Sequence, residues 1–151
     1  MAVCGQQAHE GGSTRLIDGR TVLDDLAATC PDVLGALKQP RSARFSDHLG
    51  AVLTDIPEPG TRPARQILRL RFDDLATFAP GLLALVPELQ AAIERQSLTI
   101  TLARGQGYLL DNHRWLHARN AFTGSRTMYR LHGNPVPGFG LRPGIPTADR
   151  P

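Results

Sequence analysis

Apolar and polar residues alternate over several short stretches of the chain, as they do in half-buried β-strands. The run "MAVCGQQA" predicts a strand that begins almost at the first residue, and "RQILRLRF" predicts another. A third is predicted by "SLTITLARG", with Leu98, Ile100 and Leu102 facing inward, and "RTMYRLHG" predicts the last strand. Residues two apart share one face of a strand, so each stretch has an apolar side to bury.

Two longer stretches have the period of an amphipathic helix. Residues 21–37 place Val22, Leu26, Val33 and Leu37 on one face. Pro31 interrupts this stretch and predicts two helical pieces, because proline lacks the amide hydrogen that a helix interior needs. A second helix is predicted to begin at Pro80, with its apolar side chains at positions 82, 83, 86, 89 and 93.

The order of these elements favours an antiparallel barrel or jelly roll with helices packed outside. Residues 54–64 hold three prolines and a glycine and predict a loop. We divide the chain into a domain over residues 1–133 and a Pro/Gly-rich tail over residues 134–151, predicted to be a loose extension. No glycine-rich phosphate-binding motif is present.

Composition is that of a globular chain, with 41% hydrophobic and 21% charged residues in 151. Two cysteines make neither a disulfide framework nor a zinc site, and neither a signal peptide nor an apolar run long enough for a membrane span is seen. We therefore expect a cytoplasmic protein with no membrane partner. The net charge of +3 would suit nucleic acid, but the cations are scattered, so we expect no nucleic-acid partner.

The last predicted strand carries cations on one face. One face carries Arg126, Met128, Arg130 and His132. The other carries Thr127, Tyr129 and Leu131. If the arginine face points inward, the guanidinium groups need an anionic ligand, because burying each unpaired charge costs roughly several kcal/mol of folding free energy. The alternative is that the arginines lie on a solvated face while Tyr129 and Leu131 pack inside. Spacing alone leaves both open.

His113 and His117 lie four residues apart in "DNHRWLHAR". On a helix this spacing would suit a shared metal ion. However, Asp111-Asn112 predicts a turn and strands flank the segment, and residues four apart on a strand are roughly 13 Å from each other. At most one of the two histidines is therefore a ligand of any one ion.

The run "LLDNHRWLHARNAFTGSRTMYR" closely resembles the C-terminal signature of the non-haem Fe(II)/2-oxoglutarate dioxygenases of the taurine dioxygenase and clavaminate synthase-like superfamily. That signature reads D-N-x-R-x-x-H-x-R-x-x-F-x-G-x-R-x-x-x-R. The earlier "CGQQAHEGGSTRLIDGRTVLDDL" is similar to the family's strand, G-G-x-T turn and following helix. The resemblance covers roughly residues 3–134 and implies a double-stranded β-helix, or jelly roll, that is mainly β with flanking helices.

The resemblance also implies roles for individual residues. His117 matches the distal histidine of the iron-binding facial triad. Arg126 matches the arginine that grips the distal carboxylate of 2-oxoglutarate, and Thr14 matches a threonine that hydrogen-bonds the same group. Arg130 matches a second arginine that supports the cosubstrate site or binds an anionic substrate. His113 would be a bystander near the turn.

One part of the family pattern is missing. None of the five histidines is followed two positions later by Asp or Glu, so the family's His-x-Asp/Glu pair of iron ligands is absent. We therefore expect a jelly roll that is incomplete at its N-terminus and open to self-association at its sheet edges. A misplaced start, a degenerate gene product and completion by a second chain all remain open.

Two functions follow from these observations. The first is an Fe(II)- and 2-oxoglutarate-dependent oxygenase acting on a small molecule, which Arg130 would suit if that molecule is anionic. In this reading the activity of the chain by itself is in doubt, because two iron ligands are missing, and we name no catalytic residue. The second is a non-catalytic remnant, or anion-binding module, that keeps the arginine pocket without iron.

Overall fold

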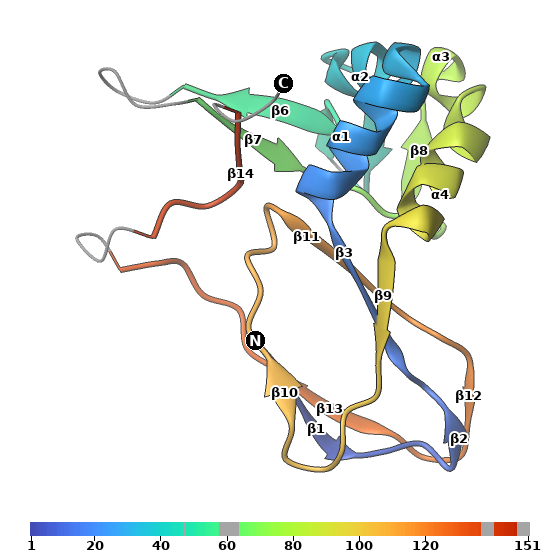
Figure 1. The fold of residues 1–151 in the computed structure, drawn as a ribbon, viewed down its shortest axis with the longest axis vertical. Coiled ribbons are helices and arrows are strands. Elements are labelled where there is room, and N and C mark those ends of the chain that lie inside the picture. Colours follow the sequence, from blue (N-terminus) through green and yellow to red (C-terminus); the bar gives the residue numbers. More distant parts are fainter. Residues whose placement is uncertain (47, 58–63, 137–140, 148–151) are drawn as a thin grey trace.

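The computed structural model describes residues 1–46, 48–57, 64–136 and 141–147. Four helices gather at one end of the molecule, and most of the longer strands extend away from them (Figure 1). The helices are α1 (Gly19–Thr29), α2 (Pro31–Lys38), α3 (Pro80–Leu83) and α4 (Val86–Arg95). The predicted break at Pro31 is confirmed. The helix predicted from Pro80 is divided into two pieces.

Of three small antiparallel sheets, two lie at the end away from the helices and one runs between that end and the helices (Figure 1). One sheet has the order β10-β1-β13, another β11-β3-β9, and the third pairs β12 with β2. Their strands are β1 (Ala2–Gln6), β2 (Glu10–Gly11), β3 (Thr14–Asp18), β9 (Ser97–Ile100), β10 (Gly107–Tyr108), β11 (Trp115–Arg119), β12 (Phe122–Thr123) and β13 (Thr127–Arg130). The strands predicted at the N-terminus, after the second helix and at "RTMYR" are all present.

Two further sheets lie nearer the helices, with the orders β5-β4-β8 and β14-β7-β6. Their strands are β4 (Ala43–Phe45), β5 (His48–Gly50), β6 (Leu53–Ile56), β7 (Arg65–Leu68), β8 (Ala76–Phe78) and β14 (Ile145–Pro146). The loop predicted over residues 54–64 is wrong at its start, because β6 continues to Ile56 and pairs with β7. Residues 58–63 lie outside the described part of the chain.

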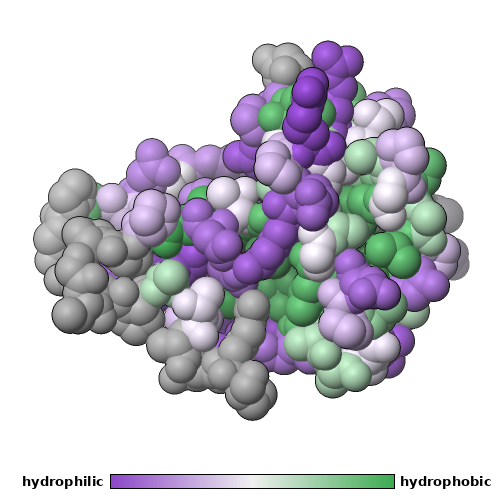
Figure 2. Space-filling model, turned by 90° about the horizontal axis from the view of Figure 1, so that it is seen from above, coloured by the Kyte–Doolittle hydropathy of each residue, from purple (hydrophilic) through white to green (hydrophobic). Residues whose placement is uncertain are grey.

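The hydrophobic core lies between the helices and the neighbouring sheets. Its buried members come from all four helices and from strands of three sheets, among them Val22, Leu23, Leu26, Val33, Leu37, Leu53, Leu68, Leu82, Leu89 and Ile145. Among the described residues, no helix has both the length and the hydrophobicity to cross a membrane. Seen from the helix-bearing end, hydrophilic and hydrophobic surface is interspersed (Figure 2).

The junction between β3 and α1 is fixed by Asp18. Its Oδ1 accepts a hydrogen bond of 3.0 Å from the amide of Arg20, which caps the start of α1. The same oxygen accepts a 2.8 Å bond from Nε of Arg114. Gly19 follows, where an added Cβ would lie 2.4 Å from the carbonyl oxygen of Arg114. Only glycine permits this approach, and it ties the helical core to the segment that leads into β11.

The predicted loose tail is wrong over residues 141–147. The strand β14 pairs with β7, and Ile145 is fully buried in the core. Asp111 Oδ2 accepts a 2.6 Å hydrogen bond from the amide of Gly144, and Arg65 Nε donates to the carbonyl of Pro143 at 2.8 Å. A buried side chain and backbone pairing therefore outweigh the Pro/Gly composition. "RTMYRLHG" is accordingly not the last strand.

The sheet face that bears Leu98 is less covered than predicted. Leu98 lies opposite Leu16 in the pairing of β9 with β3, so the two side chains share a face. Leu16 is buried, but Leu98 is 58% exposed. The predicted direction of Leu98 agrees with the register, but the described residues leave it open to solvent.

Replacing Ile145 with alanine tests whether the tail belongs to the core. Because Ile145 is fully buried, we expect Ile145→Ala to lower the free energy of unfolding by about 2–5 kcal/mol. Leu141→Ala is the matched control, since Leu141 is 72% exposed, and should cost less than about 0.5 kcal/mol. Urea unfolding followed by circular dichroism measures both. Equal stability of the two variants would contradict a buried C-terminal strand.

Candidate functional site

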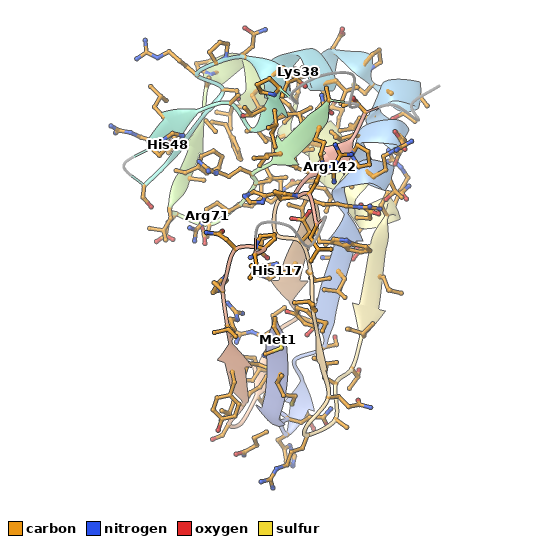
Figure 3. All side chains as sticks on the ribbon, turned by 90° about the vertical axis from the view of Figure 1, so that its left-hand side faces the viewer. Met1, Lys38, His48, Arg71, His117 and Arg142 are labelled. Carbon is orange, nitrogen blue, oxygen red and sulfur yellow. The ribbon has the colours of Figure 1, made fainter. Side chains whose placement is uncertain are left out.

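One cavity of about 460 Å³ brings together residues from strands that are far apart in sequence. It is lined by the first residue of β3, by all of β11, by Arg126 with two residues of β13, and by the end of β7 with the segment that follows it. All four residues singled out by the sequence lie on its wall: Thr14, His117, Arg126 and Arg130. The cavity lies beyond the helices, in the middle of the molecule, where Figure 3 shows His117 and Arg71.

The pairing of β3 with β11 places His117. The segment is a strand, as predicted, and His117 lies opposite Leu16 while Arg119 lies opposite Thr14. Residues directly opposite in an antiparallel pair project from the same face, and so do alternate residues of one strand. Thr14 and His117 therefore project from the same face of this sheet.

Arg126 reaches the cavity beside the turn at Gly11-Gly12. Gly12 has a φ of 70°, and an added Cβ would lie 3.2 Å from Cδ of Arg126. A side chain at this position would therefore strain the backbone and crowd the stem of Arg126. Nη2 of Arg126 lies 3.5 Å from Oγ1 of Thr14, which is itself buried. The G-G-x-T turn thus brings Thr14 and Arg126 together although they are 112 positions apart.

The pairing of β1 with β13 settles which face of the last arginine-bearing segment turns inward. Arg130 and Met128 lie opposite Ala2 and Cys4, which are both buried. Arg126, Met128 and Arg130 line the cavity. Tyr129 and Leu131 are instead 67% and 64% exposed. The face with Arg126, Met128 and Arg130 is therefore the one turned to the cavity, where Arg130 is still exposed, and the alternative with Tyr129 and Leu131 packed inside is not observed.

The pKa of His117 lies below the usual histidine value of 6.5. The main cause is partial burial: His117 is exposed overall, but protein atoms beside its ring displace water that would stabilise the imidazolium. The positive charges of Arg130, His132 and the N-terminus lower the pKa further. Nδ1 of His132 lies 3.3 Å from Nδ2 of Asn112. Neutral imidazole is the form that binds a metal ion, and the surroundings of His117 favour it.

His113 does not line the cavity. Its backbone amide donates a 2.9 Å hydrogen bond to Oδ1 of Asp111, and its carbonyl accepts one of 3.0 Å from the amide of Leu68. This is the position of a turn residue that joins β7 to the approach to β11. Of the two histidines, only His117 faces the cavity.

The described residues do not by themselves make an iron site. No group of three or more His, Cys, Asp or Glu side chains in this part of the chain is arranged to hold a metal ion. Of the described residues that line the cavity, His117 is the one with an imidazole, and the carboxylate of Asp73 is paired with Arg71. Tight Fe(II) binding needs several ligands held together, so one imidazole supplies only part of such a site.

Several cavity residues were not predicted from the sequence. Arg69, Arg71 and Asp73 come from the segment after β7, and Arg119 comes from β11. Arg119 stood in the quoted signature, and its spacing of two from His117 on a strand predicts a shared face. The segment after β7 gave no comparable signal, because its place on the cavity wall depends on the pairing of distant segments.

Comparison with solved structures identifies what this arrangement resembles. An asparagine oxygenase in complex with Fe(II), 3-hydroxyasparagine and succinate matches with a TM-score of 0.62 and 18% identity over 82% of this chain and 39% of that protein. The non-haem iron oxygenase OrfP in complex with Fe matches with a TM-score of 0.53 and 14% identity over 84% of this chain and 45% of OrfP. The chain shares the fold of non-haem iron oxygenases.

The likeness has definite bounds. The chain spans less than half the length of either oxygenase, and at these identities the similarity concerns the fold alone. No protein-family model matches the chain, and no curated protein sequence matches it. The comparison therefore agrees with the predicted mainly β oxygenase-type fold and leaves the roles of the cavity residues to chemical argument.

The protonation of His117 gives a test of the cavity's electrostatics. Because its folded pKa is lowered, the unfolded chain takes up a proton first as the pH falls. The stabilisation from keeping His117 neutral is complete above pH 6.5 and is lost as the pH falls from there through the lowered pKa. An NMR titration of the imidazole Hε1 should give a midpoint below 6.5, and Arg130→Gln should raise it. A midpoint unchanged in Arg130→Gln would remove Arg130 from the surroundings of His117.

Proposed function

We propose that this chain carries the cosubstrate-binding part of a non-haem Fe(II)/2-oxoglutarate-dependent oxygenase that acts on a small molecule. The single observation that supports this best is the convergence of Thr14, His117, Arg126 and Arg130 on one cavity. These residues come from three strands and the turn before one of them, and the fold is that of iron oxygenases. In this proposal the sheets around the cavity are part of a jelly roll that other residues complete.

Arg126 and Thr14 are suited to one end of a dicarboxylate. The guanidinium group offers two parallel N–H donors to a carboxylate, and the threonine hydroxyl offers a third. Among the described residues Arg126 has no carboxylate partner, and its closest polar contact is the 3.5 Å approach to Thr14. Its donors are therefore available to a ligand, and burial of Thr14 holds the hydroxyl in place.

His117 is suited to the other end of the site. In this proposal it supplies one ligand of the iron, and two further ligands come from outside the described residues. When bound, the iron and 2-oxoglutarate would supply the oxidising chemistry that protein side chains lack. The chain's own contribution is to fix the dicarboxylate by its distal end and to keep a neutral imidazole facing the cavity.

The substrate is proposed to be a small anionic molecule. Arg130 lines the cavity, lowers the pKa of His117 through its charge, and has no carboxylate partner among the described residues. An anion bound there would lie beside the residue proposed to hold the iron. Leu98 is exposed on the sheet face that also carries His117, and we further propose that the chain associates through this face, with itself or with the segment that supplies the missing ligands.

A non-catalytic anion-binding module is the second candidate. The observation in its favour is that no metal-binding cluster is found among the described residues. Fe(II)-dependent formation of succinate from 2-oxoglutarate distinguishes the two functions, because the module would bind the dicarboxylate without consuming it. A tight one-to-one site for Mn(II) under anaerobic conditions, abolished by His117→Ala, would show that the missing ligands are supplied.

Arg126→Lys tests the proposed cosubstrate site. Lysine keeps the positive charge but loses the paired donors, so we expect 2-oxoglutarate binding to weaken by about 1.5–3 kcal/mol. Isothermal titration calorimetry measures the affinity. Arg130→Ala is the comparison variant and should act mainly on an anionic substrate. Unchanged 2-oxoglutarate affinity in Arg126→Lys would defeat the assignment.

A further inference from the structure

Arg119 is a cavity residue to which the proposed function gives no role. It lies directly opposite Thr14 in the pairing of β11 with β3, on the face that carries His117. Side chains opposite each other in an antiparallel pair have Cβ atoms about 4.5–5.5 Å apart. Thr14 is also the residue that Arg126 approaches. Arg119, on β11, therefore lies opposite the same threonine that Arg126, in the turn before β13, approaches.

An aromatic ring fixes the position of the Arg119 head group. Its Cζ lies 4.5 Å from the centre of the Phe122 ring, within the range of a cation–π contact. Phe122 pairs with Gly11 across β12 and β2, and its Cβ lies 3.2 Å from the place where a Cβ on Gly12 would stand. Cδ of Arg126 lies at the same distance from that point. One tight turn thus supports both arginine side chains.

The contact with Phe122 holds the guanidinium group over the ring but leaves its N–H groups free. Among the described residues Arg119 forms no ion pair, whereas Arg71, another cavity arginine, is paired with Asp73. Arg119 and Arg126 are two cations on the wall of one cavity, and neither has a carboxylate partner among the described residues, so their charges repel each other. An anionic group bound between them would offset that repulsion and accept hydrogen bonds from both guanidinium groups.

We propose that Arg119 is a second cationic contact for the distal carboxylate of the dicarboxylate cosubstrate and selects 2-oxo diacids over 2-oxo monoacids. This inference rests on the proposed function, because it assigns the distal carboxylate to Thr14 and Arg126. It adds that the carboxylate is held from two sides, by Arg126 and by Arg119. The contact with Phe122 restricts Arg119, which reduces the freedom that this exposed side chain would lose on ligand binding.

The test compares two ligands that differ at one end. NMR titrations of the 151-residue chain with 2-oxoglutarate and with 2-oxopentanoate, which lacks the distal carboxylate, give two dissociation constants per variant. We expect Arg119→Gln to weaken 2-oxoglutarate by about 3- to 10-fold and 2-oxopentanoate by less than about 2-fold. Arg119→Lys should restore part of the difference. Arg104→Gln is the matched control, since Arg104 is exposed and does not line the cavity.

The outcomes separate this inference from the proposed function. If Arg126→Lys weakens 2-oxoglutarate binding and Arg119→Gln does not, the second contact is wrong and the cosubstrate site stands. If neither change matters, or the unaltered chain binds no 2-oxoglutarate, both are wrong. Equal weakening of both ligands by Arg119→Gln would assign Arg119 a structural role and overturn the proposed selectivity.

Discussion

The antiparallel pairing of β3 with β11 is the contact on which the rest of the site depends. Five residue pairs, from Thr14 with Arg119 to Asp18 with Trp115, set Thr14 and His117 on one face. At the other end of the pair, Asp18 caps α1 and binds Arg114. Burial alone would raise the pKa of Asp18. Hydrogen bonds from Arg114 and from the Arg20 amide, together with the charges of both arginines, have the larger opposite effect, so the pKa lies below its usual value of 3.8. The same pair therefore joins the helical core to the cavity.

Positive charge dominates the cavity and shapes its chemistry. Arginines come from three separate parts of the chain, and Asp73 is the one carboxylate among the described lining residues. These cations disfavour a protonated His117 and favour an anionic ligand, so the two effects support each other. A cavity of this kind gains stability when an anion enters, because the repulsion among its arginines is then offset.

Local pattern was sufficient to predict much of the fold and of the site. The alternation of residues predicted the strand β13, which carries Met128 and Arg130. Pro31 predicted the break between α1 and α2. The interior orientation of the arginines was not decided by spacing, because both faces of a strand are equivalent until a partner covers one. Burial of Ala2 and Cys4 opposite Arg130 and Met128 decided it.

Long-range contacts explain what the sequence did not reveal. The tail looks disordered in composition, but Ile145 fills the core and Asp111 holds the preceding glycine. Arg69 and Arg71 reach the cavity wall because β7 is tied to the turn at His113, through a bond between residues 45 positions apart that no local pattern encodes. The burial of Leu98 was predicted from alternation alone, which gives direction but not the presence of a covering layer.

Mapping bound 2-oxoglutarate by backbone-amide chemical shifts tests the central claim most directly. The account predicts that the amides of Thr14, His117, Arg119 and Arg126 shift together along one saturating curve. Amides of the second, more apolar surface pocket, around Ser42 and Leu82, should stay unchanged. Shifts confined to that pocket, or scattered without saturation, would contradict a dicarboxylate site built on the pairing of β3 with β11.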